Sequence, residues 1–267
     1  MVEAASAFAE DDLISNEPVT VVLSEKGWVR AAKGHEVNPL ELNFRGGDSY
    51  SHSARGRTNE TLVFLDSSGR TYAVAPHTLP SARGQGEPLT GRLKPPAGAR
   101  FTGVVMGPGS TRVLLASNAG YGFVGKLDDM VTKNKAGKAT LSVPKEGVSL
   151  PPVVLTDEEG LLVAAVTNQG RMLVFPLADL PELARGKGNK LINIPTAAFK
   201  SGEEQMVAVK ILGPADELLV LAGQRHLRMK QKDLEHYVGE RARRGRKLPR
   251  GFQKVDSLAV EGPERSD

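Results

Sequence analysis

The sequence of 267 residues contains no cysteine, which excludes disulfide bonds and thiolate metal sites. It has no apolar run approaching the roughly 18–20 residues that a membrane-spanning helix needs, so membrane contact is not expected. The N-terminus lacks the basic and then apolar segments of a signal peptide, since no Lys or Arg precedes Lys26. Together these absences predict a cytoplasmic protein.

Motifs for catalysis and cofactor binding are also absent from the sequence. There is no GxxxxGK[ST] phosphate loop, and the Gly84–Gly86 and Gly186–Gly188 pairs lack the third glycine of a dinucleotide fingerprint. The five histidines show no metal-ligand spacing, and no nucleophile has a base beside it. The sequence therefore predicts a binding protein with no metal, no cofactor and no active site.

Acidic residues gather at the two ends and conceal a basic middle. The whole chain has 35 basic and 31 acidic side chains. Residues 1–17 hold five acids and no base, and residues 261–267 hold three acids and one base. This leaves 34 basic against 23 acidic side chains between 18 and 260, a net charge of +11. Such a basic core favours a polyanion as partner.

A β-hairpin pattern recurs five times along the chain. Two runs of β-forming residues flank a polar turn that closes on glycine, as in a hairpin whose loop needs a positive φ. The copies span 19–33, 61–74, 113–124, 161–190 and 218–229. The turn anchors are Gly27, Gly69, Gly120, Gly170 and Gln224, at intervals of 42, 51, 50 and 54 residues. Gln224 stands where glycine is expected, so the fifth copy is degenerate.

A second anchor supports this alignment of the copies. Ten residues after the turn anchor stand Leu79, Met130, Leu180 and Leu234, with Val37 as a looser match in the first copy. Sheet-forming repeats of 40–55 residues predict a propeller-like all-β ring of about five four-stranded blades. A single hairpin is equally compatible with an unrelated β-sandwich, but five in register argue against one.

The composition predicts three segments. Residues 1–17 form an acidic, flexible leader or linker, residues 18–260 form the five-repeat domain, and residues 261–267 form a flexible tail. The degenerate fifth copy predicts a blade that closes poorly or lies at the end of the array.

Loops that mix glycine with Arg or Lys follow the second anchor in four copies. They span 82–86, 133–138, 184–190 and 241–247, and the first copy has only 45–47. Because the four loops share one place in the repeat, a ring of blades would set them on one edge as a cationic belt that neutralises phosphates. Solvated loops are the alternative, which is less plausible for four equivalent loops than for one.

The residues predicted to contact the polyanion lie mainly in these loops. Some weaker candidates lie where strands leave the turns. They are Arg30, Lys33, Arg45, Arg83, Lys133, Lys135, Lys138, Arg171, Arg185, Lys187, Lys190, Arg225, Arg228, Arg241, Arg243, Arg244, Arg246 and Lys247. Aromatic residues make up only 5% of the chain and offer no visible platform on which bases could stack. If the polyanion is a nucleic acid, a duplex is therefore favoured over a single strand. No recognition helix or zinc finger is present, which predicts little sequence preference.

Several stretches make the sequence resemble the C-terminal domain of ParC, the DNA-cleaving subunit of bacterial topoisomerase IV. They are EPVTVVLS (17–24), GWVRAAKGH (27–35), LPSARGQGEPLTG (79–91), AGYGF (119–123) and GKGNKLINIP (186–195). The resemblance covers about residues 17–260. It implies a β-pinwheel, a propeller-like open or broken ring of five blades that exchange strands with their neighbours.

The same resemblance implies a function in a bacterial enzyme at the nucleoid. This domain would bind double-stranded DNA around its outer edge, bend it, and present the transported segment, thereby tuning decatenation and supercoil preference. Its partners would be the N-terminal region of ParC and the other, ATP-hydrolysing subunit of topoisomerase IV. DNA cleavage, ATP and Mg chemistry would thus lie outside this chain. The isolated domain is expected to be a monomer without catalytic activity.

The sequence departs from the related gyrase domain at one motif. The gyrase box Gln-Arg-Arg-Gly-Gly-Lys-Gly has no intact copy, and the nearest match is AlaArgGlyLysGly at 184–188. This departure favours bending of DNA over complete wrapping. A propeller that serves as a protein-docking scaffold remains the alternative function, and the salt dependence of DNA binding would distinguish the two.

Overall fold

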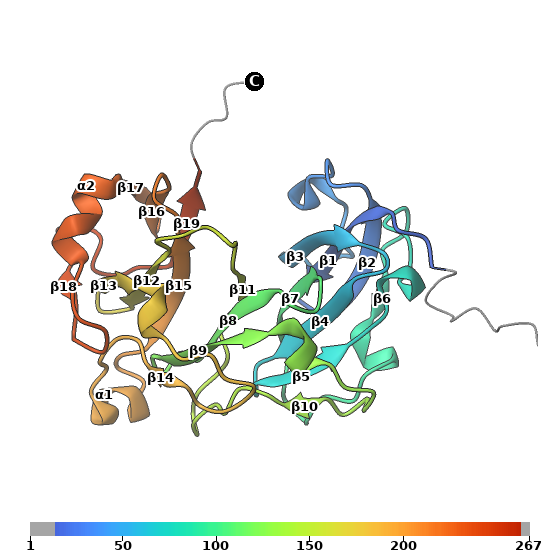
Figure 1. The fold of residues 1–267 in the computed structure, drawn as a ribbon, viewed down its shortest axis with the longest axis horizontal. Coiled ribbons are helices and arrows are strands. Elements are labelled where there is room, and N and C mark those ends of the chain that lie inside the picture. Colours follow the sequence, from blue (N-terminus) through green and yellow to red (C-terminus); the bar gives the residue numbers. More distant parts are fainter. Residues whose placement is uncertain (1–13, 263–267) are drawn as a thin grey trace, which may run out of the picture.

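The computed structural model describes residues 14–262, which form five antiparallel sheets arranged around a common centre (Figure 1). The predicted all-β propeller is therefore confirmed. β1 begins at Pro18 and β19 ends at Glu261. Residues 1–13 of the predicted leader and 263–267 of the predicted tail lie outside the described residues. No helix within 14–262 has the length and apolar character to cross a membrane.

The strands of each blade run in order from the centre of the ring outward. Blade 1 contains β3 (Tyr50–Arg57), β1 (Pro18–Ser24), β2 (Trp28–Lys33) and β6 (Glu87–Pro88). Blade 2 contains β7 (Phe101–Gly107), β4 (Thr61–Asp66), β5 (Arg70–Ala73) and β10 (Lys138–Ala139). Blade 3 contains β11 (Val153–Val154), β8 (Arg112–Ala116), β9 (Tyr121–Lys126) and β14 (Asn189–Lys190). Blade 4 contains β15 (Met206–Leu212), β12 (Leu162–Thr167), β13 (Arg171–Pro176) and β18 (Arg246–Lys247). Blade 5 contains β19 (Ser257–Glu261), β16 (Glu217–Ala222) and β17 (Arg225–Met229).

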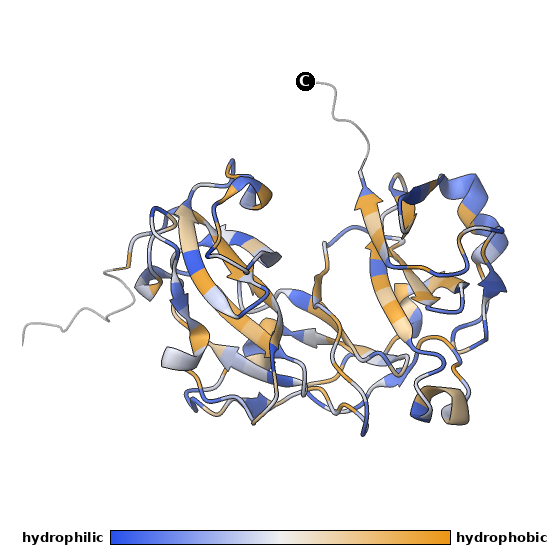
Figure 2. Cartoon of the chain, turned by 180° about the vertical axis from the view of Figure 1, so that it is seen from behind, coloured by the Kyte–Doolittle hydropathy of each residue, from blue (hydrophilic) through white to orange (hydrophobic). Residues whose placement is uncertain are grey.

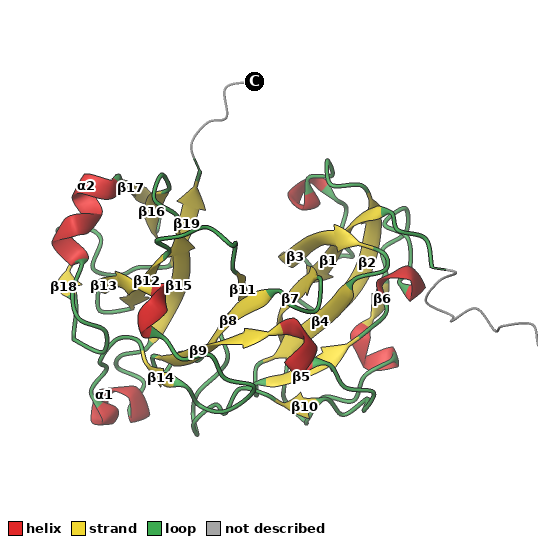
Figure 3. Ribbon diagram, in the orientation of Figure 1, coloured by secondary structure: helices red, strands yellow, loops and turns green. Residues whose placement is uncertain are grey.

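The helical segments are short and lie in the connections between strands (Figure 3). The α-helices are α1 (Thr196–Lys200) and α2 (Gln231–Leu234). The 3-10 helices are η2 (Pro39–Glu41), η3 (Pro76–Thr78), η4 (Leu89–Gly91), η5 (Leu127–Met130), η6 (Leu177–Asp179) and η7 (Glu235–Tyr237). Leu79, Met130, Leu180 and Leu234 each lie at the end of such a helical turn, and all but the half-buried Leu79 are buried. The second anchor of the repeat is thus the residue through which each connection packs against the hydrophobic core.

Glycine closes the hairpin turn in every blade. Gly27, Gly69, Gly120 and Gly170 have φ of 79°, 89°, 84° and 70°, which confirms the predicted positive-φ positions. The fifth hairpin differs from the prediction. Its turn has two residues, Gly223 and Gln224, and the positive φ of 60° belongs to Gly223. Glycine at the first position of a two-residue turn is typical of type II′ hairpins, so the fifth copy keeps its glycine within a shorter loop.

Neighbouring repeats exchange strands. After the β4–β5 hairpin of blade 2, the chain returns to blade 1, where β6 pairs with β2. It then comes back to blade 2, where β7 pairs with β4. The same path gives blades 2, 3 and 4 their outer strands β10, β14 and β18. The strand exchange that the resemblance implied is therefore present.

Blade 5 has only three strands because no further hairpin follows β17 within the described residues. This corrects the prediction of four strands for that blade. No strand pairing joins blades 1 and 5 among residues 14–262, and Figure 1 shows them on either side of an opening in the ring. The array is an open ring, as expected for a terminal fifth blade.

The hydrophobic core lies between successive blades. One cluster joins blades 1 and 2 and includes Leu23, Phe64 and Tyr72, with Phe101 packed edge-on against both rings at centroid distances of 6.3 and 5.5 Å. Three further clusters join blades 2 and 3, 3 and 4, and 4 and 5. Figure 2 shows the hydrophobic residues concentrated in the strands. Each blade therefore depends on its neighbour for burial.

His52 connects two blades at the centre of the ring. Its Nδ1 accepts a hydrogen bond of 3.0 Å from the backbone N–H of Val104 on β7. Burial, and next the nearby positive charge of Lys210, lower the pKa of His52 to about 4. The ring is therefore neutral at pH 7, and protonation in the folded state is unfavourable.

Acidification should destabilise the fold through His52. The folded-state pKa of His52 lies below the ordinary value of 6.5, so on acidification the unfolded chain takes up the proton before the folded one does. The unfolding free energy is therefore unaffected by His52 above pH 6.5 and falls as the pH is lowered toward 4. Between pH 7 and pH 4.5 the wild type should lose about 2–3 kcal/mol of unfolding free energy that the His52→Asn variant does not lose. Urea unfolding of both proteins at the two pH values measures this difference, and equal losses would contradict it.

Candidate nucleic-acid interface

The four glycine–basic loops lie on the outer rim because each directly precedes an exchanged outer strand. Loop 82–86 leads into β6, 133–137 into β10, 184–188 into β14 and 241–245 into β18. These strands are the outermost of blades 1 to 4. The loops therefore occupy equivalent places on four successive blades, at the outer edge of the ring in Figure 1.

The last glycine of each loop is required by packing. Gly86, Gly137, Gly188 and Gly245 have φ of 85°, 77°, 78° and 74°. A Cβ at any of them would lie under 3.0 Å from the neighbouring strand of the receiving blade, against backbone in all four cases. Their role is thus to let the chain join that blade, since a side chain at these positions would collide with its backbone.

Arginines at turn exits hold these loops in place. Arg70 donates from Nε to the carbonyl oxygen of Ala136 and from Nη2 to that of Gly137, at 2.8 and 2.9 Å. Arg171 donates to the carbonyl oxygen of Gly245 at 3.3 Å. These side chains use their donors within the protein, so they position the loops.

Arg30, a predicted contact, also holds a loop in place and is buried away from the exposed rim. It donates to the carbonyl oxygens of Gly84 and Asn43, at 2.9 and 2.7 Å. Its guanidinium also lies 4.8 Å from the ring centroid of Phe44. Only 4% of Arg30 is exposed, and burial lowers its pKa. A ligand on the rim does not reach it.

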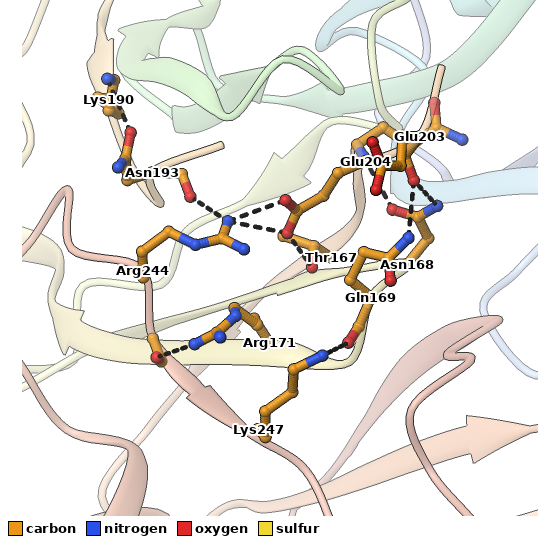
Figure 4. A network of polar contacts seen from close by, with 12 residues as sticks. Thr167, Asn168, Gln169, Arg171, Lys190, Asn193, Glu203, Glu204, Arg244 and Lys247 are labelled. Carbon is orange, nitrogen blue, oxygen red and sulfur yellow. Dashed lines mark hydrogen bonds and ion pairs between the residues drawn. The ribbon is translucent and has the colours of Figure 1, made fainter. Parts of the chain in front are cut away.

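Arg244 of the fourth loop is tied to a buried carboxylate (Figure 4). Its Nη1 lies 2.9 Å from both carboxylate oxygens of Glu204 and donates to the carbonyl oxygen of Asn193 at 2.7 Å. Glu204 is 3% exposed and also accepts from the hydroxyl of Thr167 at 3.0 Å. The sequence pattern did not indicate Glu204 because it lies 40 residues from its partner, in a connection without a recurring pattern.

Several other predicted cations also have partners inside the protein. Arg241 donates to the carbonyl oxygen of Lys190, Lys138 to that of Asp129 and Lys247 to that of Gln169. Lys190 contacts the side chain of Asn193, and Arg243 pairs with Glu240. Arg228 lies between Glu217 and Glu261, whose hydrogen bonds raise its pKa.

The remaining predicted cations are exposed and their side chains make no hydrogen bond or ion pair with any residue from 14 to 262. They are Lys33, Arg45, Arg83, Lys133, Lys135, Arg185, Lys187, Arg225 and Arg246. Six of them belong to the loops and outer strands of blades 1 to 4, and we call these six the rim cations: Arg83, Lys133, Lys135, Arg185, Lys187 and Arg246. Every one of these four blades contributes at least one.

Two aromatic rings lie beside free cations, which the sequence did not lead us to expect. Arg45 lies 3.9 Å from the ring centroid of Trp28, and Lys187 lies 3.9 Å from that of Tyr121. Both aromatic residues directly follow a turn glycine, the position that Arg70 and Arg171 occupy in blades 2 and 4. Cation–π contact orients the charged groups without neutralising them. Among the described residues no group of three or more acidic or histidine side chains is placed to hold a metal ion.

Comparisons with known proteins agree with this architecture. A family model described as "DNA gyrase C-terminal domain, beta-propeller" matches residues 162–211. The A subunit of DNA topoisomerase 4 from Pseudomonas aeruginosa is 52% identical over 259 residues, which cover 97% of this chain and 34% of that protein. Its counterpart from Escherichia coli K12 is 46% identical over 264 residues, 99% of this chain and 35% of that protein. The chain spans about a third of the length of these curated relatives.

A solved structure matches over its entire length. The "Structure of the E. coli ParC C-terminal domain" superimposes with a TM-score of 0.81 and 45% identity, covering 92% of this chain and 100% of that one.

Two glycines of one loop test the packing role. Gly86→Ala forces a positive φ on alanine and brings its Cβ against Val29, so it should cost about 2 kcal/mol or more of unfolding free energy. Gly84→Ala is the matched control, since its Cβ meets nothing nearer than 3.8 Å and its φ lies outside the left-handed region. It should change stability by less than about 0.5 kcal/mol. Equal urea midpoints for the two variants would overturn the assignment.

Arg244 and Arg246 separate a structural cation from a free one. Arg244→Met leaves Glu204 buried without its cation and should cost about 1–3 kcal/mol, below the value for a fully buried pair because the Arg244 side chain is 33% exposed. Arg246→Met should cost less than about 0.5 kcal/mol. Adding Glu204→Gln to the first variant should recover part of the loss. A destabilised Arg246→Met with an unaffected Arg244→Met would reverse the two roles.

Proposed function

Because the chain belongs to the family of the ParC C-terminal domain, we propose that it binds duplex DNA along its outer rim and catalyses no reaction itself. The observation that carries this proposal is the placement of the rim cations, which recur at one position of the repeat on four successive blades. A charge run on one loop could be ordinary surface. The strand exchange brings four such loops to the same edge of the ring, so positive charges recur along that edge from blade to blade.

Contact with the phosphate backbone follows from the chemistry of these groups. The rim cations are exposed and have no ion pair within the described residues, so they can neutralise phosphates and release counterions. The described part of the chain places no long helix on the rim that could enter a major groove. Binding should therefore depend on salt and tolerate most sequences.

Bending of the DNA is the finer part of the proposal. A straight duplex touches a curved rim over only part of its arc, so contact with blades 1 to 4 together requires the DNA to curve. Bending a site of 20–30 base pairs by 40–90° costs on the order of 1–6 kcal/mol, which additional phosphate contacts can offset. The incomplete gyrase-like box at 184–188 supports bending in preference to a complete wrap.

In the full-length ParC protein, we propose that this domain presents the transported DNA segment. It would thereby influence the choice between decatenation and supercoil substrates, working with the N-terminal region of ParC and with the ATP-hydrolysing subunit of topoisomerase IV. ATP and Mg would act in those other regions. The domain by itself is proposed to be a monomer, with the bacterial nucleoid as its place of action.

The salt dependence of binding distinguishes free cations from paired ones. Lys135→Gln removes a rim cation and should lower the slope of log K against log salt by about 0.9 for a duplex. Arg228→Gln changes the net charge equally but removes a cation already paired with two carboxylates, so its slope should stay close to the wild type. Fluorescence anisotropy with two unrelated duplexes at several salt concentrations measures both slopes. Salt-insensitive or absent DNA binding would instead favour a protein-docking scaffold.

A further inference from the structure

The inner strands of four blades converge on a pocket at the centre of the ring. The pocket has a volume of about 440 Å³ and includes residues of β3, β7, β11 and β15. Its titratable lining residues are all basic: His52 and Arg55 from blade 1 and Lys210 from blade 4. No carboxylate among residues 14–262 lines it. The rim loops lie on the opposite, outer edges of the same blades, so the pocket is separate from the proposed DNA contact.

Lys210 has no counter-charge in the part of the chain that the structure describes. Its side chain is half-buried, burial lowers its pKa, and its ammonium makes no hydrogen bond or ion pair with residues 14–262. A partly buried charge without a partner is unfavourable. The buried carboxylate Glu204, in contrast, has both Arg244 and Thr167 as partners. Lys210 is therefore available to pair with an external anion.

His52 adds a hydrogen-bond donor to the lining of the pocket. Its Nδ1 accepts the N–H of Val104, so in the neutral ring the proton resides on Nε2. The pocket thus combines an imidazole N–H, the ammonium of Lys210 and the guanidinium of Arg55. All three groups can donate hydrogen bonds, and Lys210 and Arg55 are basic side chains.

We propose that this central pocket binds the phosphate group of a small anionic ligand. A phosphate dianion matches the two positive charges and supplies several acceptor oxygens for a set of donors. Pockets of a few hundred cubic ångströms are typical of small-molecule sites, so a phosphate ester larger than inorganic phosphate can enter. The apolar residues Val104, Met106 and Val153 form the wall beside these donors.

Calorimetric titration with pyrophosphate at constant ionic strength tests the site. The wild type should show one saturable site, and Lys210→Met should weaken the affinity at least tenfold. His52→Asn keeps an acceptor for the Val104 N–H while removing the Nε2–H donor, and should weaken binding severalfold. Lys135→Gln is the control, since it removes a rim cation and should leave pyrophosphate affinity unchanged.

Folding and DNA binding are checked on the same variants. Lys210→Met without pyrophosphate should melt at or above the wild-type temperature, since it removes an unpaired, partly buried charge. It should bind duplex DNA like the wild type. The proposal is overturned if wild-type protein shows no saturable pyrophosphate binding, if Lys210→Met binds like the wild type, or if Lys135→Gln loses as much affinity. A parallel loss of duplex affinity in Lys210→Met would assign the pocket to DNA phosphates and would also overturn it.

Discussion

The exchange of outer strands between repeats is the constraint on which the structure depends. Each of blades 1 to 4 is completed by two residues that belong to the next repeat. The chain must therefore cross to a neighbouring blade, meet its backbone closely at a positive-φ glycine, and return. That crossing requires a loop on the outer edge, and the basic residues are in that loop. Assembly of the fold and distribution of charge are consequences of one path of the chain.

The same crossing divides the cations into two classes with different physical roles. Arg30, Arg70 and Arg171 bind loop carbonyl oxygens, and Arg244 neutralises a buried carboxylate. These side chains fix the loops by hydrogen bonds that a ligand would have to break. The rim cations lie in the crossing loops or in β18, and none of them has a hydrogen bond or ion pair from its side chain within residues 14–262. Net charge alone does not separate the two classes of cation. The class of each side chain depends on how buried it is and on whether it has a partner within the protein.

The repeat pattern was sufficient to predict the all-β ring, the turn glycines and the rim position of the loops. Those features follow from local rules, since a hairpin glycine and its anchor lie ten residues apart in one copy. Gly84, which accepts a hydrogen bond from Arg30, lies 54 residues away, and Glu204, which pairs with Arg244, lies 40 residues away, so these internal partners could not be predicted from the sequence. The shorter turn at Gly223 shifted the fifth anchor by one residue for a similar reason. A two-residue and a three-residue loop place glycine differently, and only the register of the strands distinguishes them.

A curved arrangement of free cations over four blades is the central claim, and the bend of bound DNA tests it most directly. Energy transfer between dyes at the ends of a short duplex reports this bend at saturating protein. Removing the terminal contacts with Arg83→Gln and Arg246→Gln should straighten the bound duplex. Removing two contacts within the arc, with Lys133→Gln and Lys135→Gln, should weaken binding by a similar amount and preserve most of the bend. An unchanged bend in the first variant, or an equal loss in both, would contradict the account.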